Sequence, residues 1–191
     1  MSRTRPHNKR DELTTAALHL FAEKGIRGTT VRDIADAAGV TEGALYRHFA
    51  GKDVLAQSLF AECARMLYEQ LDGAVSAVAG ARQQLCSLAR GFMDFAQTQP
   101  EAYEYVMARH HESVGALPPD QPLPKDVFVR VIEQGVAAGE LRPMDPQLAA
   151  AMMIGLLVRT IFFTQRGLID MTAADIAAEV CGAVQRILLT K

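Results

Sequence analysis

Helical periodicity runs through every long segment of this chain and constrains its fold more than any other feature. Apolar residues recur three and four positions apart, and no segment alternates apolar and polar residues as a half-buried strand does. We therefore predict an all-α protein of about nine helices. Two are short helices capped by Thr30 and Thr41, and the other seven are expected at residues 9–24, 52–71, 82–98, 101–112, 126–138, 147–166 and 173–189.

The two short helices are joined by the tight turn Ala38-Gly39-Val40. Such a pair predicts a helix-turn-helix, whose second helix enters the major groove of DNA. With about 100° between successive residues, one side of this second helix presents polar and basic groups. These are Glu42, Gly43, Tyr46 and Arg47. The opposite side, which holds Ala44, Leu45, His48 and Phe49, is expected to pack against the protein.

The consecutive residues GIRGTTVRDIADAAGVTEGALYRHFAGKDVL, at positions 25–55, resemble the TetR family of transcriptional regulators. The shared pattern begins with a threonine that opens the first short helix, followed by Ile-Ala and Ala-Gly-Val. It continues with a small residue early in the second helix, then Tyr-x-His-Phe, and ends with a lysine and an acidic residue shortly before a leucine. The resemblance covers about residues 9–55. It implies a DNA-binding domain at residues 1–52 and a ligand-binding and dimerisation domain at residues 53–191.

The distribution of charge agrees with this division. Residues 1–52 hold nine Lys and Arg against six Asp and Glu, whereas residues 53–191 hold eleven against sixteen. The first ten residues, MSRTRPHNKR, either contact DNA phosphates or form a solvated terminus.

We expect double-stranded DNA to be contacted by a set drawn from both short helices and the residues around them. The set is Thr29, Thr30, Arg32, Thr41, Glu42, Gly43, Ala44, Tyr46, Arg47, His48 and Lys52. Thr30 and Tyr46 suit phosphates. Arg47 and Arg32 suit either a guanine or a phosphate, and Glu42 either accepts from a cytosine amine or only caps its helix. The resemblance gives His48 and Lys52 contacts to the DNA backbone.

The last two predicted helices suit a homodimer. Helix 173–189 is rich in alanine and glycine, whose small side chains let helices approach closely. A two-fold pair of recognition helices also matches a palindromic operator.

An effector pocket is predicted among apolar residues of the C-terminal domain, although a single apolar residue on a helical stripe is more often a core residue than a ligand contact. The candidates are Met66, Phe92, Met93, Phe95, Met107, His110, Phe128, Met152, Arg159, Phe162 and Phe163. Arg159 suits either an anionic ligand or an acid across the dimer. Adjacent residues on a helix point about 100° apart, so the pair His110-His111 is not expected to bind a metal.

The resulting hypothesis is a repressor that a small apolar or amphipathic effector releases from its operator, with no cofactor. Two other classes of protein are alternatives. An enzyme is disfavoured because no Ser-His-Asp context, phosphate-binding glycine loop or HExxH motif occurs. A DNA-binding protein that no ligand regulates would have a filled C-terminal core.

Cys63, Cys86 and Cys181 are expected to be buried thiols in a reducing compartment, since they are odd in number and widely spaced. No signal peptide is expected at the charged start of the chain. The apolar stretch from Leu148 contains Arg159 and is expected to fall short of a membrane-spanning length. These features favour a soluble cytoplasmic protein.

Overall fold

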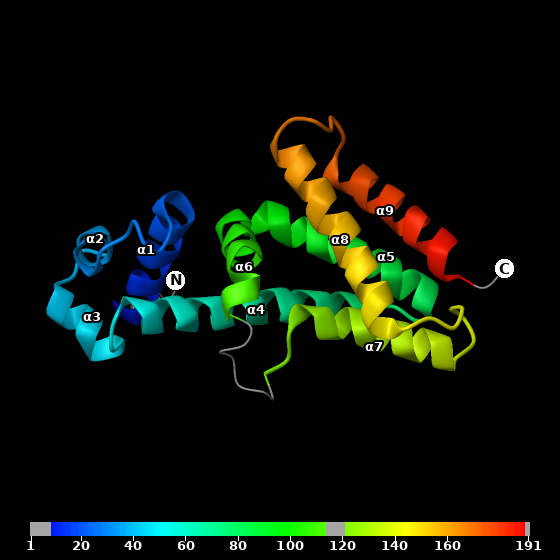
Figure 1. The fold of residues 1–191 in the computed structure, drawn as a ribbon, viewed down its shortest axis with the longest axis horizontal. Coiled ribbons are helices and arrows are strands. Elements are labelled where there is room, and N and C mark those ends of the chain that lie inside the picture. The colour runs from blue at the N-terminus through cyan, green and yellow to red at the C-terminus, as the bar shows by residue number, and fades with distance from the viewer. Residues whose placement is uncertain (1–8, 114–120, 190–191) are drawn as a thin grey trace, which may run out of the picture. The chain divides into compact units, whose positions relative to one another are not determined.

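The computed structural model describes residues 9–113 and 121–189, except for the side chains of residues 110–113. These residues form nine α-helices, which confirms the predicted fold class (Figure 1). The helices are α1 (Lys9–Lys24), α2 (Val31–Ala37), α3 (Glu42–His48), α4 (Lys52–Ser76), α5 (Ala81–Thr98), α6 (Pro100–Ser113), α7 (Pro124–Ala137), α8 (Pro146–Gln165) and α9 (Ala173–Leu188). The largest departure from the predicted bounds is α4, which continues to Ser76 and buries Val75 in its added turn. Part of the segment between the predicted helices 101–112 and 126–138 lies outside the described residues.

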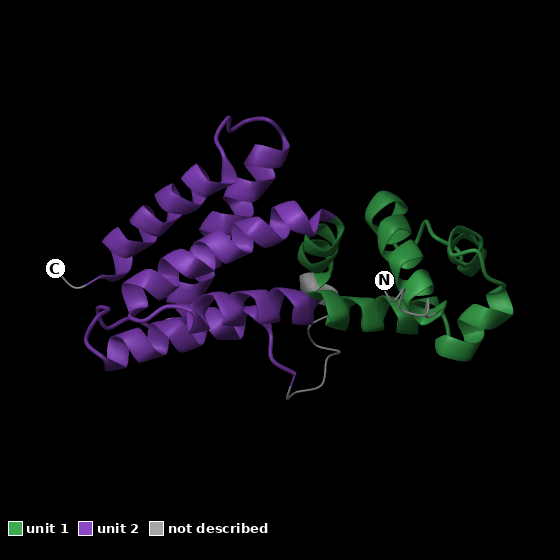
Figure 2. Ribbon diagram, turned by 180° about the vertical axis from the view of Figure 1, so that it is seen from behind, with its two compact units in different colours: residues 1–63, 101–119 green, residues 64–100, 120–191 purple. Residues whose placement is uncertain are grey.

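Packing groups the described residues into two compact units (Figure 2). The first unit comprises residues 9–63 and 101–113, and the second comprises residues 64–100 and 121–189. Helix α4 contributes its beginning to the first unit and its remainder to the second. The division into units does not test the predicted domain boundary after residue 52, which stays a prediction.

The first unit is built around a core that α6 completes. The rings of Phe21 in α1 and Tyr105 in α6 stack with their centroids 5.9 Å apart. The Tyr105 hydroxyl donates a hydrogen bond of 2.9 Å to the carbonyl of Ala56 in α4. At the surface, His19 Nδ1 lies 2.8 Å from Glu101 Oε1. Helix α6 is therefore fixed to both α1 and α4 by specific contacts.

The second unit packs α5 against α9 and α7 against α8. The aromatic rings of Phe92 and Phe128 meet edge to face, with centroids 6.1 Å apart. Gly135 in α7 is required by close packing, because a Cβ atom there would lie 2.7 Å from both Ala81 Cβ and Leu141 Cδ1.

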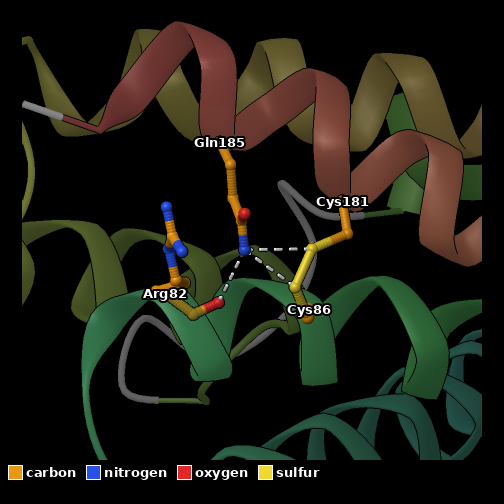
Figure 3. The surroundings of a disulfide bond; sticks show 4 residues. All are labelled: Arg82, Cys86, Cys181 and Gln185. Atoms are coloured by element: carbon orange, nitrogen blue, oxygen red, sulfur yellow. Dashed lines mark hydrogen bonds between the residues drawn. A yellow bond between two sulfur atoms is a disulfide. The ribbon is translucent and has the colours of Figure 1, made fainter. Parts of the chain in front are cut away.

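The structure corrects the expectation of three free thiols. Cys86 in α5 and Cys181 in α9 form a disulfide, with their Cα atoms 5.0 Å apart, and Cys63 is a buried free thiol (Figure 3). Spacing along the chain could not predict this pairing, because 95 residues separate the two cysteines. The packing of α5 on α9 brings them together.

The expectation for the apolar stretch from Leu148 is also wrong in one respect. Helix α8 has 20 residues and a window of mean hydropathy 1.6, so its length and composition suffice to cross a membrane. Only 28% of that window is buried within the chain. A core helix of a soluble protein has the same composition, but here much of the apolar surface is left uncovered. Leu148, Met152 and Leu156 are exposed by 55%, 39% and 38% and recur at every fourth residue of α8.

Candidate nucleic-acid interface

Helix α2 begins at the predicted cap Thr30, which forms a capping box with Asp33. The backbone N–H of Asp33 donates to Thr30 Oγ1 at 3.1 Å, and the backbone N–H of Thr30 donates to Asp33 Oδ2 at 2.8 Å. The hydrogen bond from the Thr30 backbone contributes most to lowering the pKa of the exposed Asp33 carboxyl below its ordinary value. The cap fixes the backbone at the start of α2 and leaves Thr30 at the surface.

Helix α3 is held by one buried side and presents the other. The backbone N–H of Ala44 donates to the capping Thr41 hydroxyl at 3.3 Å. Ala44 and Leu45 are buried, whereas Tyr46 is 55% exposed. Glu42, Gly43 and Arg47 are exposed as well, so the predicted polar face of α3 lies at the surface.

Two residues of the predicted set stabilise the turn that precedes α2. Thr29 is fully buried, and its hydroxyl donates to the carbonyl of Gly25 at 2.8 Å. The Lys52 ammonium donates to the carbonyls of Ile26 and Thr29 at 2.7 and 2.6 Å. The side chain of Thr29 therefore does not face solvent. Lys52 ties the first turn of α4 to the start of the helix-turn-helix and retains one of its three ammonium hydrogens for another acceptor.

His48 is placed differently from the prediction. It was expected on the packing side of α3, but it is exposed. The reason is that α3 ends at His48 and the backbone becomes extended at Phe49 (φ −137°, ψ 133°), so the Phe49 ring takes the inner position. Ala44, by contrast, is only 3% exposed and packs inward.

Gly43 and Arg32 both lie open at the surface. A Cβ atom at Gly43 would meet only Thr41 Oγ1, at 3.9 Å. Nothing within the described protein therefore requires glycine at this position. Arg32 Nε lies 3.7 Å from Asp36 Oδ2 one turn along α2, and both side chains are more than 70% exposed. Such an exposed pair is weak and leaves the guanidinium able to meet another anion.

The predicted pocket residues differ in their burial. Phe92, Met93, Phe95 and Phe128 are core residues that are at most 3% exposed. Met66 and Met107 are half-buried, but Met66 belongs to the second unit and Met107 to the first. Met152 is exposed on α8. The guanidinium of Arg159 lies over the rings of Phe162 and Phe163, 4.8 and 4.7 Å from their centroids. The side chain of His110 lies outside the described residues, as does the basic segment of residues 1–8.

The comparisons with known proteins identify the family of this chain. Residues 13–59 match the family described as bacterial regulatory proteins, tetR family. The transcriptional repressor KstR2 of Mycobacterium tuberculosis is 30% identical over 154 residues, which cover 72% of this chain and 71% of that protein. The chain belongs to the TetR family. It is therefore a DNA-binding transcription regulator and not an enzyme.

A second family model and several solved structures also match the chain. Residues 124–190 match the C-terminal domain of AefR-like transcriptional repressors. A TetR family regulator from Marinobacter aquaeolei has the same fold, with a TM-score of 0.79 at 18% identity and 96% coverage of each chain. The fatty acid degradation regulator FadR of Bacillus halodurans matches with a TM-score of 0.76 at 18% identity, over 95% of this chain and 96% of that one.

Sequence reasoning missed the connection between Lys52 and the turn before α2. The lysine was expected only to contact a phosphate. The approach of residue 52 to residues 26 and 29 depends on the packing of three helices, for which no local pattern in the sequence gives a signal.

Proposed function

We propose that this TetR-family regulator is a repressor that reads a palindromic operator through the exposed face of α3, as a cytoplasmic homodimer. The observation that carries the DNA part is the combination of buried Ala44 and Leu45 with exposed Tyr46 and Arg47 on a helix of seven residues. A short helix anchored on one side is rigid enough to enter a major groove with its other side. The repressor role is inferred from the names of the relatives.

Different residues of this face are expected to have different roles. Tyr46 offers a hydroxyl to a phosphate, which adds affinity for any sequence. Arg47 is long enough to donate two hydrogen bonds to a guanine, which adds preference for one base pair. Thr30, which is exposed at the start of α2, is expected to contact another phosphate.

The test begins by selecting bound sequences from a random DNA pool and footprinting the best one. Two half-sites related by a dyad are expected, at a separation of about one helical turn or somewhat more. Arg47→Ala should then cost roughly 1–3 kcal/mol on the selected site and relax the preference at one base pair. Tyr46→Phe serves as the comparison, because it should weaken binding to selected and scrambled DNA by the same factor. If Arg47→Ala also weakens binding to selected and scrambled DNA by the same factor, Arg47 contacts only the DNA backbone.

Dimerisation is proposed through α8 and α9. Leu148, Met152 and Leu156 form an apolar stripe on α8, and Ala174 and Ala178 are exposed on α9. Covering such a stripe with a second copy removes apolar surface from water, which favours association. A dimer would also place two recognition helices on one operator.

We further propose that a small apolar or amphipathic effector binds the helices of the second unit and weakens operator binding. Support comes from the family and from two relatives, the regulator named for fatty acid degradation and the repressor KstR2. Because α4 is continuous from Lys52 to Ser76, a ligand that changes its position can affect the segment that Lys52 ties to the DNA-binding turn. A ligand with different affinities for the two states shifts their populations by that difference.

The effector is tested by thermal-shift screening of fatty acids, steroids and acyl thioesters, followed by titration of each hit against the operator complex. We expect a stabilising compound to reduce operator affinity by roughly 5- to 150-fold. A compound that binds within the second unit and leaves operator affinity unchanged would contradict the coupling and favour a regulator that no ligand controls.

A further inference from the structure

The disulfide between α5 and α9 has surroundings that bear on its chemistry. The side-chain amide nitrogen of Gln185 lies 3.0 Å from Cys86 Sγ, 3.3 Å from Cys181 Sγ and 3.2 Å from the carbonyl oxygen of Arg82 (Figure 3). The amide is thus directed at both sulfur atoms. An N–H donor at this position stabilises negative charge on either sulfur.

The three cysteines differ in their access to solvent. Cys86 is partly exposed, Cys181 is 6% exposed and Cys63 is 1% exposed. Burial also raises the pKa of the Cys63 thiol to about 12, so it carries almost no thiolate near neutral pH. Cys86 is therefore the cysteine most open to a soluble oxidant, Cys181 is held beside it, and Cys63 is an internal reference.

A regulator that binds DNA works in a compartment where small thiols keep cysteines reduced. A disulfide at this position then has to form in response to an oxidant and be reduced again afterwards. An accessible sulfur next to a held partner is the arrangement that such a cycle needs.

We propose that Cys86 and Cys181 form a reversible oxidation site for hydroperoxides. The Cys86 thiolate attacks one oxygen of the O–O bond, which breaks, so that Cys86 becomes a sulfenic acid and the other oxygen leaves as water or an alcohol after protonation. The sulfur of Cys181 then attacks the sulfenic sulfur and expels water, giving the disulfide. In total, two thiols and one hydrogen peroxide give one disulfide and two waters. Two molecules of a small thiol reverse the change and are joined in a disulfide themselves.

The first experiment titrates the folded, reduced full-length chain with hydrogen peroxide. The total thiols, counted in denaturant, should fall from three to one, and peptide mass spectrometry should identify a Cys86–Cys181 link. Dithiothreitol added without denaturant should restore both thiols. The proposal would be overturned if Cys86 and Cys181 both remained thiols after peroxide treatment. It would also be overturned if dithiothreitol reduced the disulfide only in the presence of denaturant.

The order of attack is tested with dimedone, which traps sulfenic acids. In Cys181→Ser the sulfenic acid cannot be resolved, so a dimedone adduct should accumulate on Cys86. In Cys86→Ser no adduct should form on Cys181 at the same peroxide concentration, and Cys63→Ser should behave like the unaltered chain. An adduct on Cys181 in Cys86→Ser at an equal rate would overturn the assignment of Cys86 as the attacking residue. Circular dichroism of each variant checks that it is folded.

Gln185 is a positioning residue in this proposal. Gln185→Leu keeps similar volume on α9 but removes the N–H donor, so peroxide oxidation of Cys86 should slow severalfold while the final disulfide remains the same. An unchanged rate would limit Gln185 to packing between the helices. These measurements need neither DNA nor effector, so their outcome is independent of the function proposed above.

Discussion

At the scale of single residues, substitution of Gly43 should affect folding stability and DNA affinity in opposite directions. An alanine there meets no crowding, and removing glycine from a helix interior gains up to about 1 kcal/mol of folding free energy. We therefore expect Gly43→Ala to be as stable as the unaltered chain or more stable, yet to bind operator DNA more weakly. The added methyl group stands on the face that has to approach the groove.

The matched control is Gly73→Ala in α4, another exposed helical glycine whose added Cβ atom would meet nothing within 4 Å. Urea unfolding and operator titration are measured for both variants. Similar gains in stability with a loss of DNA affinity only in Gly43→Ala support the assignment. Equal DNA affinities for the two variants would remove Gly43 from the interface.

At the scale of elements, the contact between α1 and α6 has a defined pH dependence. The hydrogen bond to Glu101 raises the pKa of His19 above its ordinary value of 6.5. A group whose pKa is raised by folding stabilises the protein fully below its unfolded pKa, and this contribution disappears as pH rises through the folded pKa. His19→Gln should therefore lower Tm near pH 5 and have almost no effect near pH 9.

The check is a series of melting curves across that range for the unaltered chain, His19→Gln and Glu101→Gln. Both side chains are well exposed, so the loss should be small and should shrink further in high salt. A loss of stability that is the same at every pH would mean that the pair contributes only through packing.

Close packing at Gly135 predicts a larger effect on α7. A methyl group at this position would overlap both Ala81 and Leu141, so Gly135→Ala should cost roughly 1–3 kcal/mol in unfolding free energy. Denaturant titration measures this cost, again with Gly73→Ala as the uncrowded control. If both Gly135→Ala and Gly73→Ala increased the unfolding free energy, α7 would be able to shift and accommodate the methyl group at no cost in stability.

At the scale of the whole molecule, the uncovered stripe on α8 predicts the oligomeric state. Leu156→Glu places a charge among Leu148 and Met152, which should convert the proposed dimer to monomer and weaken operator binding strongly. Analytical ultracentrifugation over a range of concentrations measures the change. Leu168→Glu is the control, because Leu168 is 68% exposed but lies beyond the end of α8. A dimer that survives Leu156→Glu would place the interface elsewhere.

The helices and the recognition face were predictable because both depend on local rules. Capping at Thr30 and Thr41 and the spacing of Ala44 and Leu45 are properties of consecutive residues. The bonds of Lys52, the exposure of His48 and the pairing of Cys86 with Cys181 were not predictable in this way. Each depends on where a distant segment lies or on where the backbone leaves a helix.

The first unit is discontinuous in sequence, and this affects how it folds during translation. Its core needs Tyr105 of α6, which stacks on Phe21 and bonds to Ala56. After residue 63 the ribosome must add roughly 40 residues before Tyr105 exists, which takes roughly 2–8 s at typical rates of synthesis. During that interval the nascent helix-turn-helix has its recognition helix but lacks part of its core. Pausing of translation between α4 and α6 should therefore prolong exposure of Phe21 to chaperones and proteases.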